Sequence, residues 1–450
     1  MSKIFLISSN TIADPYPVYP LGMAVVASSL SSQGHTVRQF DFLAAEHSWE
    51  RLRIELARFQ PDIVGISLRN IDNLDSTSPD SLWSLALNRE MVKTIREATD
   101  APVVLGGSAF SIMPEAILDY VGADYGIAGE GESLFNKLVV QIEKGIKPDR
   151  VLRNHGDSFF DIDASRPLWE KDLIQFYGEK GGIIGLQTKR GCGYHCTYCT
   201  YPAVEGARLR YREPGRVVDE IDRLIKDFDI HSVFFTDSVF NDAKGHYLSL
   251  AEELISRELP VAWSAFFHPH RMTVEEMRLL KRSGLYMVEL GTDAATDTTL
   301  AELKKEYDFG EVLELNRLCL QERVPCFHYV IFGCPGETDL TVEEGLKNTE
   351  RLKGSLVMAF SGIRLFPGTV LYQRAIEEGV LSPDDSLLAP RYYFSPKIDE
   401  ASMNEAVQKA FGRRRDRIFP PSDGYIRLRA LSLFGFRGAA WSKLIRFDEG

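Results

Sequence analysis

The strongest constraint on the fold is an alternation of short apolar segments with helical patterns along most of the 450 residues. Such alternation predicts parallel sheets covered by helices. A first series predicts strands at 4–8, 36–40, 63–67, 103–106 and 125–128. A second series predicts strands at 183–188, 232–237, 261–267, 286–291, 327–333 and 356–365. Between the two series the pattern fades, and Pro, Asp and Gly accumulate as in an inter-domain linker.

These series predict an α/β fold in two domains. Residues 1–145 form a doubly wound, Rossmann-like sheet, 146–180 a linker, and 181–375 a partial (β/α)6 barrel. Residues 376–450 are expected to form a short helical extension, part of which lies as a lid over the barrel mouth. Ligands bind at the carboxyl ends of the strands in both fold types. We therefore expect the functional residues at those ends.

Composition narrows the class of protein. The chain is 44% hydrophobic and 26% charged, which is ordinary for a globular protein. Its net charge of −12 argues against nucleic acid as the main partner. No apolar run reaches the length of a membrane span, and the first residues indicate a buried strand rather than a signal peptide. Six cysteines, three of them bunched, indicate a reduced, cytoplasmic protein rather than a disulfide framework.

The bunched cysteines follow the first predicted barrel strand. Cys192, Cys196 and Cys199 have the spacing C-x3-C-x2-C. Three thiolates suit a [4Fe–4S] cluster and leave one iron without a protein ligand. A zinc site would need a fourth ligand, and His195 stands too close to its neighbours to share their metal easily. A structural zinc or a chance group of buried cysteines is the alternative.

With Tyr198 before its third cysteine, this run resembles the cluster loop of the radical S-adenosylmethionine (SAM) superfamily. The resemblance implies that the three cysteines are the catalytic metal ligands and that SAM binds the open iron. It also implies SAM contacts at other strand ends, although turns or ion pairs explain each residue equally well on its own. The candidate SAM contacts are Tyr198, Asp237, Glu289, Gly333 and Arg364.

The first domain resembles the cobalamin-binding domain that is fused to radical SAM enzymes. The resemblance rests on Tyr19–Gly22, the segment 61–67, the Gly106–Gly107 pair and Gly129–Glu132. It implies cobalamin contacts at Leu21, Gly22, Ser67, Leu68, Arg69, Asn70, Gly106, Gly107, Ser108, Gly129, Glu130, Gly131 and Glu132.

One departure from other cobalamin proteins concerns the cobalt. The motif Asp-x-His-x-x-Gly, which supplies a histidine to cobalt, is absent from the sequence. The resemblance then implies base-off cobalamin with no protein histidine ligand, and the loop 68–70 beneath the cobalt. A flavodoxin-like domain that binds a nucleotide, or nothing, is the alternative. No glycine-rich dinucleotide fingerprint supports nucleotide binding.

Together the resemblances imply an enzyme that methylates an unactivated carbon. A flavodoxin- or ferredoxin-type reductant would supply an electron, SAM would give a 5′-deoxyadenosyl radical, and methylcobalamin would deliver the methyl group. Members of the family also catalyse cyclisation, oxidation or rearrangement without methyl transfer. A non-catalytic cobalamin or redox sensor is a further alternative, and the sequence leaves all three open.

The tail is basic within an acidic protein. Residues 413–446 contain nine Lys/Arg against two Asp/Glu, interleaved with large apolar residues such as Leu428, Phe434 and Trp441. This pattern suits a helix on the inner, anionic membrane surface, which would favour a lipid substrate. It equally suits a C-terminal helix that packs its apolar side on the barrel.

Overall fold

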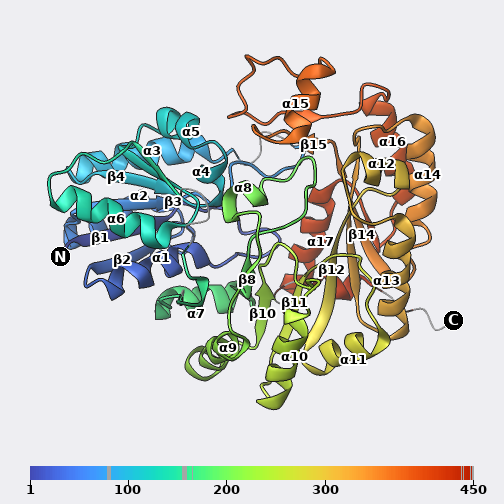
Figure 1. Cartoon of the computed structure of the whole chain (residues 1–450), viewed down its shortest axis with the longest axis horizontal. Helices are drawn as coiled ribbons and strands as arrows, with labels where there is room; N and C mark the ends of the chain where they lie inside the picture. The colour runs from blue at the N-terminus through green and yellow to red at the C-terminus, as the bar shows by residue number, and fades with distance from the viewer. Residues whose placement is uncertain are drawn as a thin grey trace.

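The computed structural model describes residues 1–78, 83–154, 160–164, 166–436, 438, 440–445 and 447. Two α/β units lie side by side, the first in blue and teal and the second in green to red (Figure 1). Each unit is built around one large parallel sheet. The α/β fold class predicted from the alternation is confirmed.

The first sheet is doubly wound. Its strand order is β2-β1-β3-β4-β5-β6. The strands are β1 (Lys3–Ser8), β2 (Thr36–Asp41), β3 (Ile63–Ser67), β4 (Val103–Gly106), β5 (Tyr125–Ala128) and β6 (Val151–Arg153). Helices α1 (Leu21–Ser32) and α6 (Gly131–Glu143) cover one face, and α2 (Trp49–Phe59), α3 (Leu85–Ala98) and α5 (Pro114–Val121) cover the other. The order reverses between β1 and β3, where such sheets bind ligands.

The expected linker is partly wrong. Within 146–180, β6 pairs with β5 and extends the first sheet, and α7 (Lys171–Lys180) precedes the second sheet. A three-residue strand is too short to show a periodicity of two. Tertiary pairing with β5 therefore decides its conformation.

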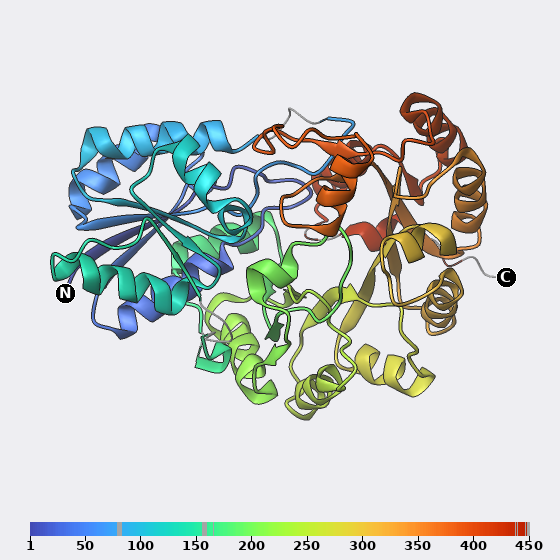
Figure 2. The same cartoon turned by 45° about the horizontal axis from the view of Figure 1, so that its top comes forward.

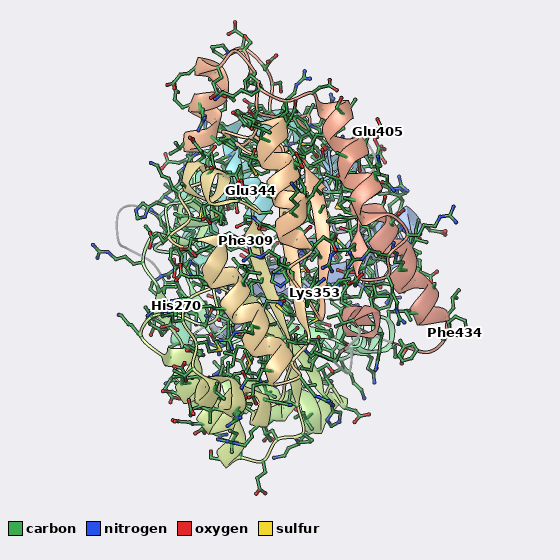
Figure 3. The ribbon with its side chains drawn as sticks, turned by 90° about the vertical axis from the view of Figure 1, so that its right-hand side faces the viewer. His270, Phe309, Glu344, Lys353, Glu405 and Phe434 are labelled. Carbon is green, nitrogen blue, oxygen red and sulfur yellow. The ribbon has the colours of Figure 1, made fainter. Side chains whose placement is uncertain are left out.

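The second sheet has the order β17-β14-β13-β12-β11-β10-β7. Its strands are β7 (Ile184–Leu186), β10 (Ser232–Phe235), β11 (Ala262–Phe267), β12 (Leu285–Asp293), β13 (Cys326–Phe332), β14 (Ser355–Ser361) and β17 (Arg417–Ile418). Its outer face is covered by α9 (Pro214–Phe228), α10 (His246–Ser256), α11 (Val274–Arg282), α13 (Phe309–Gln321), α14 (Asp339–Thr349) and α16 (Glu400–Phe411) (Figure 3). Capping boxes at Thr273 and Asp308 fix where α11 and α13 begin.

Short elements connect these strands and helices. They are α4 (Ser108–Ile112), η1 (Ile162–Ala164), β8 (Lys189–Arg190), α8 (Tyr201–Glu205), β9 (Arg210–Tyr211), α12 (Asp297–Glu302), β15 (Ile363–Arg364), α15 (Val370–Glu377) and β16 (Tyr392–Tyr393). β16 pairs antiparallel with β15 beside the carboxyl end of β14, where a lid over the mouth was expected.

The expectation that 376–450 is only a helical extension is wrong in one respect. β17 joins the barrel sheet beside β14. After it, α17 (Pro421–Leu433) and η2 (Ala440–Leu444) bury Leu428 and Trp441 against the inner side of the sheet. The Trp441 ring centroid lies 5.1 Å from that of Phe327, near the amino end of β13. The tail thus closes the end of the barrel opposite the mouth.

Part of the tail remains exposed. Leu433 and Phe434, at the end of α17, are 86% and 81% exposed (Phe434 is labelled in Figure 3). Arg437 and Arg446, which contribute to the basic pattern, lie outside the described residues. In the described part of the chain no helix is both long and apolar enough to cross a bilayer.

Candidate active site between the two sheets

The three-cysteine loop lies at the carboxyl end of the second sheet, between β8 and α8. Gly191 opens it with φ +94°, where a Cβ would lie 2.1 Å from the Arg208 carbonyl oxygen, so only glycine fits. The Cys192 N–H donates to the Gly206 carbonyl (3.0 Å) and the Cys199 N–H to that of Cys196 (3.2 Å). These bonds fold the loop into a compact turn.

All three cysteines of the loop are free thiols. Burial raises the pKa of Cys199 to about 11 and also raises that of Cys192, and the neighbouring cysteines add to both shifts. In the absence of a metal, burial therefore favours the thiol over the thiolate at Cys192 and Cys199. Metal binding would displace these protons, because the thiolate is the ligand.

The donor set fits an iron–sulfur cluster. Among the described residues, no three His, Cys, Asp or Glu side chains converge as the ligands of one ion would. A cube takes one thiolate at each of three irons, so its three cysteine sulfurs lie farther apart than the ligands that share a single zinc. Three free thiols in one loop match the first arrangement.

A segment that sequence reasoning missed, residues 303–307, packs against the cysteine loop. The Thr197 N–H donates to the Leu303 carbonyl (3.1 Å), and Lys305 Nζ donates to the Tyr198 hydroxyl (3.2 Å). Lys305 also forms an ion pair with Asp293 at the end of β12. No motif marks this segment, so only the fold reveals its position.

An aromatic group missed by sequence reasoning also lies at the mouth. The ring of His268, just after β11, stacks on Tyr194 of the cysteine loop with centroids 4.4 Å apart. Tyr307 meets the same ring edge-on at 4.9 Å. Burial lowers the pKa of His268 to about 3, so the imidazole is neutral, and its Nδ1 has no partner among the described residues.

Asp237, just after β10, is fully enclosed by protein groups. One oxygen accepts from the backbone N–H groups of Thr188 (2.7 Å) and Lys189 (3.2 Å), and the other accepts from the Thr188 hydroxyl. The Lys189 ammonium lies 3.8 Å away and also pairs with Asp242 at 3.0 Å. These contacts join the first barrel strand to its neighbour, and a SAM contact at Asp237 stays a prediction.

Glu289, in the middle of β12, faces the barrel interior. Its Oε2 accepts from the Tyr329 hydroxyl at 2.7 Å, while the buried Oε1 has no partner among the described residues. Burial raises the pKa of Glu289 to about 7. Tyr16, from the loop after β1, and Tyr286 are close enough to interact electrostatically with it. An unsatisfied buried oxygen is uncommon and marks a candidate functional group.

Two other predicted SAM contacts have structural partners. The Gly333 and Cys334 N–H groups donate to Glu337 at 2.5 and 2.8 Å, which forms the turn after β13. Arg364 is buried and pairs with Asp72 of the first unit at 2.8 Å. Figure 2 shows the orange segment after β14 beside the blue loops of the first unit, in agreement with this ion pair.

In the first unit the predicted cobalamin residues at the switch point come together. Gly107 has φ +101°, and a Cβ there would lie 2.3 Å from the Leu68 carbonyl oxygen. The Leu68 N–H donates to the Gly106 carbonyl (2.8 Å), and the Ser108 hydroxyl donates to the Arg69 carbonyl (3.0 Å). These bonds fix the loop 67–70 at the carboxyl end of β3. Leu21 and Gly22 begin α1 nearby, and the space beside Gly22 is open.

The loop 67–70 lies close to the second unit. The Arg69 side chain is exposed, and Tyr201 of α8 is 43% exposed. Burial nevertheless lowers the pKa of Arg69 and raises that of Tyr201, and the two groups interact electrostatically. Glycines at a switch point allow a large cofactor to approach the backbone closely.

Gly129–Glu132 connects the first unit to the cysteine loop. The Glu130 carboxylate accepts from Arg190 at 3.2 Å and Arg210 at 2.7 Å, and Glu132 pairs with Arg190 at 2.6 Å. Gly131 begins α6, and the Gly129 N–H donates to Ser111. These carboxylates thus hold the strand before the cysteines, and a direct contact with cobalamin stays a prediction.

Comparisons with known proteins agree with this geometry. Residues 10–139 match the B12 binding domain family, and residues 186–347 match the Radical SAM superfamily. The solved structure of the methyltransferase TsrM from Kitasatospora setae, with cobalamin and a [4Fe–4S] cluster bound, is similar over 98% of this chain and 97% of that chain. Its TM-score is 0.84 at 24% sequence identity.

Two methyltransferases from Streptomyces species are also similar to this chain. The tryptophan 2-C-methyltransferase of Streptomyces laurentii is 24% identical over 81% of this chain and 73% of its own. The cytidylyl-2-hydroxyethylphosphonate methyltransferase of Streptomyces wedmorensis is 24% identical over 90% of this chain and 88% of its own. The two family matches correspond to the two parallel sheets of the chain.

Proposed function

The protein is a radical SAM enzyme with an N-terminal B12-binding domain, and we propose that it methylates an unactivated carbon of a small-molecule substrate. The observation that carries the proposal is the meeting of the two cofactor-binding edges. Helix α8, directly after Cys199, contacts α4, directly after Gly107 (Figure 1). Arg190 fixes this arrangement through Glu130 and Glu132.

The residues of the chain supply position and exclude water. Cys192, Cys196 and Cys199 would hold a [4Fe–4S] cluster, and the loops 67–70 and 106–108 would hold cobalamin. When bound, the cluster, SAM and cobalamin supply the electron, the hydrogen-abstracting radical and the methyl group. The contact between α8 and α4 brings these loops together, and confinement of a reactive species there would direct it to one bond.

The test uses protein reconstituted without oxygen with iron, sulfide and cobalamin. After addition of SAM and dithionite, we expect both 5′-deoxyadenosine and S-adenosylhomocysteine. Cys196→Ala should abolish 5′-deoxyadenosine formation and retain cobalamin. Cys334 is a buried thiol outside the loop, so Cys334→Ala should retain both 5′-deoxyadenosine formation and cobalamin.

Two results would contradict the proposal. Cleavage of SAM by Cys196→Ala without a cluster would exclude the radical mechanism. Formation of 5′-deoxyadenosine without S-adenosylhomocysteine, in the presence of an accepted substrate, would assign the chain to the non-methylating chemistry. The magnesium-protoporphyrin IX monomethyl ester cyclase of Rubrivivax gelatinosus, 26% identical over 75% of this chain, makes that outcome worth measuring.

We further propose that Arg69 lies beneath the cobalt of base-off cobalamin. The loop 68–70 is fixed by Gly106–Ser108, and the exposed Arg69 guanidinium is close enough to Tyr201 of α8 to interact electrostatically with it. Arg69→His should introduce a ligand and shift the visible spectrum of bound cobalamin, whereas Arg69→Lys should leave cobalt without a protein ligand. An unchanged spectrum for Arg69→His would place the loop elsewhere.

The partners in this proposal are an external one-electron reductant of the flavodoxin or ferredoxin type and, through the tail, an anionic membrane surface. Burial of Leu428 and Trp441 removes most of the apolar face that favoured a lipid substrate. The exposed Leu433 and Phe434 remain as a contact for a bilayer. Leu433→Ser with Phe434→Ser should reduce cosedimentation with phosphatidylserine vesicles, and equal binding would retire the membrane contact.

A further inference from the structure

Lys305 is a buried lysine beside the cysteine loop that no motif identified. Only 9% of its side chain is exposed. Its ammonium forms an ion pair with Asp293, donates to the Tyr198 hydroxyl at 3.2 Å and lies 5.2 Å from the centre of the Tyr198 ring. Because Tyr198 stands between two of the cluster cysteines, these contacts fix a positive charge at the loop.

The charge of Lys305 reaches every thiol of the loop. The lysine interacts electrostatically with Cys192, Cys196 and Cys199. The backbone is fixed as well, since the Thr197 N–H donates to the Leu303 carbonyl. A buried charge is costly unless it is compensated, and Asp293 is the one carboxylate that the structure pairs with it among the described residues.

We propose that Lys305 is a positioning residue for the cluster, whose fixed ammonium compensates the negative charge of the three thiolates and favours the reduced state. A cube bound by three thiolates carries net negative charge, and reduction adds one more electron. A cation held nearby therefore stabilises the reduced cluster more than the oxidised one. This inference rests on the cluster in the proposed function and is independent of methyl transfer.

The test compares Lys305→Met with Lys304→Met in the full chain loaded with iron, sulfide and cobalamin. Lys304 is the adjacent residue and is exposed, so its loss removes the same charge from solvent. Iron and sulfide are counted first. The cluster is then titrated with dithionite in the presence of redox mediators and without SAM, and the paramagnetic reduced cluster is measured by electron paramagnetic resonance. One electron passes from the reductant to the cluster.

We expect a more negative midpoint potential for Lys305→Met. At the wild-type midpoint its ratio of reduced to oxidised cluster should fall about tenfold, the order expected for one unit charge in a protein interior. Lys304→Met should match the wild type, because water screens an exposed charge. Lys305→Arg, which keeps the charge, should restore most of the potential. The effect would then belong to the charge and not to packing.

Each other outcome is decisive. A loaded Lys305→Met with the wild-type midpoint overturns the inference, as does an equal shift in Lys304→Met. If Lys305→Met takes up no iron, Asp293→Asn decides, because it leaves the ammonium without its carboxylate: a less negative midpoint supports the inference, and any other result overturns it. If the wild type itself takes up no iron, the proposed function fails before this question arises.

Discussion

Two buried carboxylates of the barrel, Asp237 after β10 and Glu289 in β12, have opposite surroundings. Both oxygens of Asp237 accept hydrogen bonds from Thr188 and Lys189, and a lysine ammonium lies nearby. Glu289 has one tyrosine donor and a second oxygen without a partner among the described residues. Burial raises the pKa of both groups, but Lys189 opposes the shift at Asp237.

These surroundings separate a structural carboxylate from an available one. Asp237 is satisfied by the protein and connects strands, so its removal should damage the fold. Glu289 retains an open acceptor in the barrel interior, so its removal should cost function more than stability. We therefore expect two roles for carboxylates of the same barrel, which their hydrogen-bond partners distinguish.

The largest expected effect is at Asp237. Asp237→Ala removes one of the two carboxylates near the buried Lys189 ammonium. It also leaves the Thr188 N–H, the Thr188 hydroxyl and the Lys189 N–H without their acceptor. We therefore expect a loss of about 3–5 kcal/mol in the free energy of unfolding. Urea unfolding followed by circular dichroism measures it. Asp227→Asn, at an exposed carboxylate on α9, is the control and should change little. Wild-type stability in Asp237→Ala would remove the distinction between the two carboxylates.

The next effect is at Glu289. Its pKa is about 7 in the folded chain, against an ordinary value of 4.5 for an exposed glutamate. Between these pH values the folded chain therefore binds more protons than the unfolded chain. Stability should therefore fall by about 3 kcal/mol as pH rises through this window. Glu289→Gln should not show this loss and should be more stable than the wild type at pH 8. The exposed Glu314→Gln variant controls for surface charge.

Activity completes the test at Glu289. If its free oxygen serves a bound cofactor or substrate, Glu289→Gln should lower the rate of S-adenosylhomocysteine formation at least about tenfold while the protein stays folded. Unimpaired turnover would show that the open oxygen has no part in the reaction, and the contrast with Asp237 would concern stability alone.

The smallest effect is at Tyr329. Its hydroxyl lowers the pKa of Glu289 by hydrogen bonding, so Tyr329→Phe should raise that pKa further above its ordinary range. We expect a loss of about 1 kcal/mol in the free energy of unfolding and a shift of the pH window to higher pH. Urea unfolding at several pH values measures both. Tyr286→Phe, whose hydroxyl bonds to Ser264, should leave the window in place.

The sequence predicted the strands of four or more residues well, because the pattern of apolar residues along each strand reflects its burial. The strands at 63–67, 103–106 and 125–128 agree with β3, β4 and β5, and most others agree within a few residues. β6 and β17, of three and two residues, were missed because their pairing depends on neighbours distant in the chain. Arg364 and Glu130 were predicted at the right strand ends, but their ion-pair partners come from the opposite unit.

The sequence by itself determined the three-cysteine donor set, the two series of strands and the glycines at 107 and 191, because spacing and backbone freedom are local properties. Only the tertiary structure decided which polar groups are satisfied. In the folded chain the Asp237 carboxylate accepts hydrogen bonds, whereas one oxygen of Glu289 has no partner among the described residues. Lys305 contacts the cysteine loop, and the tail packs against Phe327. Hydrogen bonding and desolvation depend on neighbours that the linear order of residues does not specify.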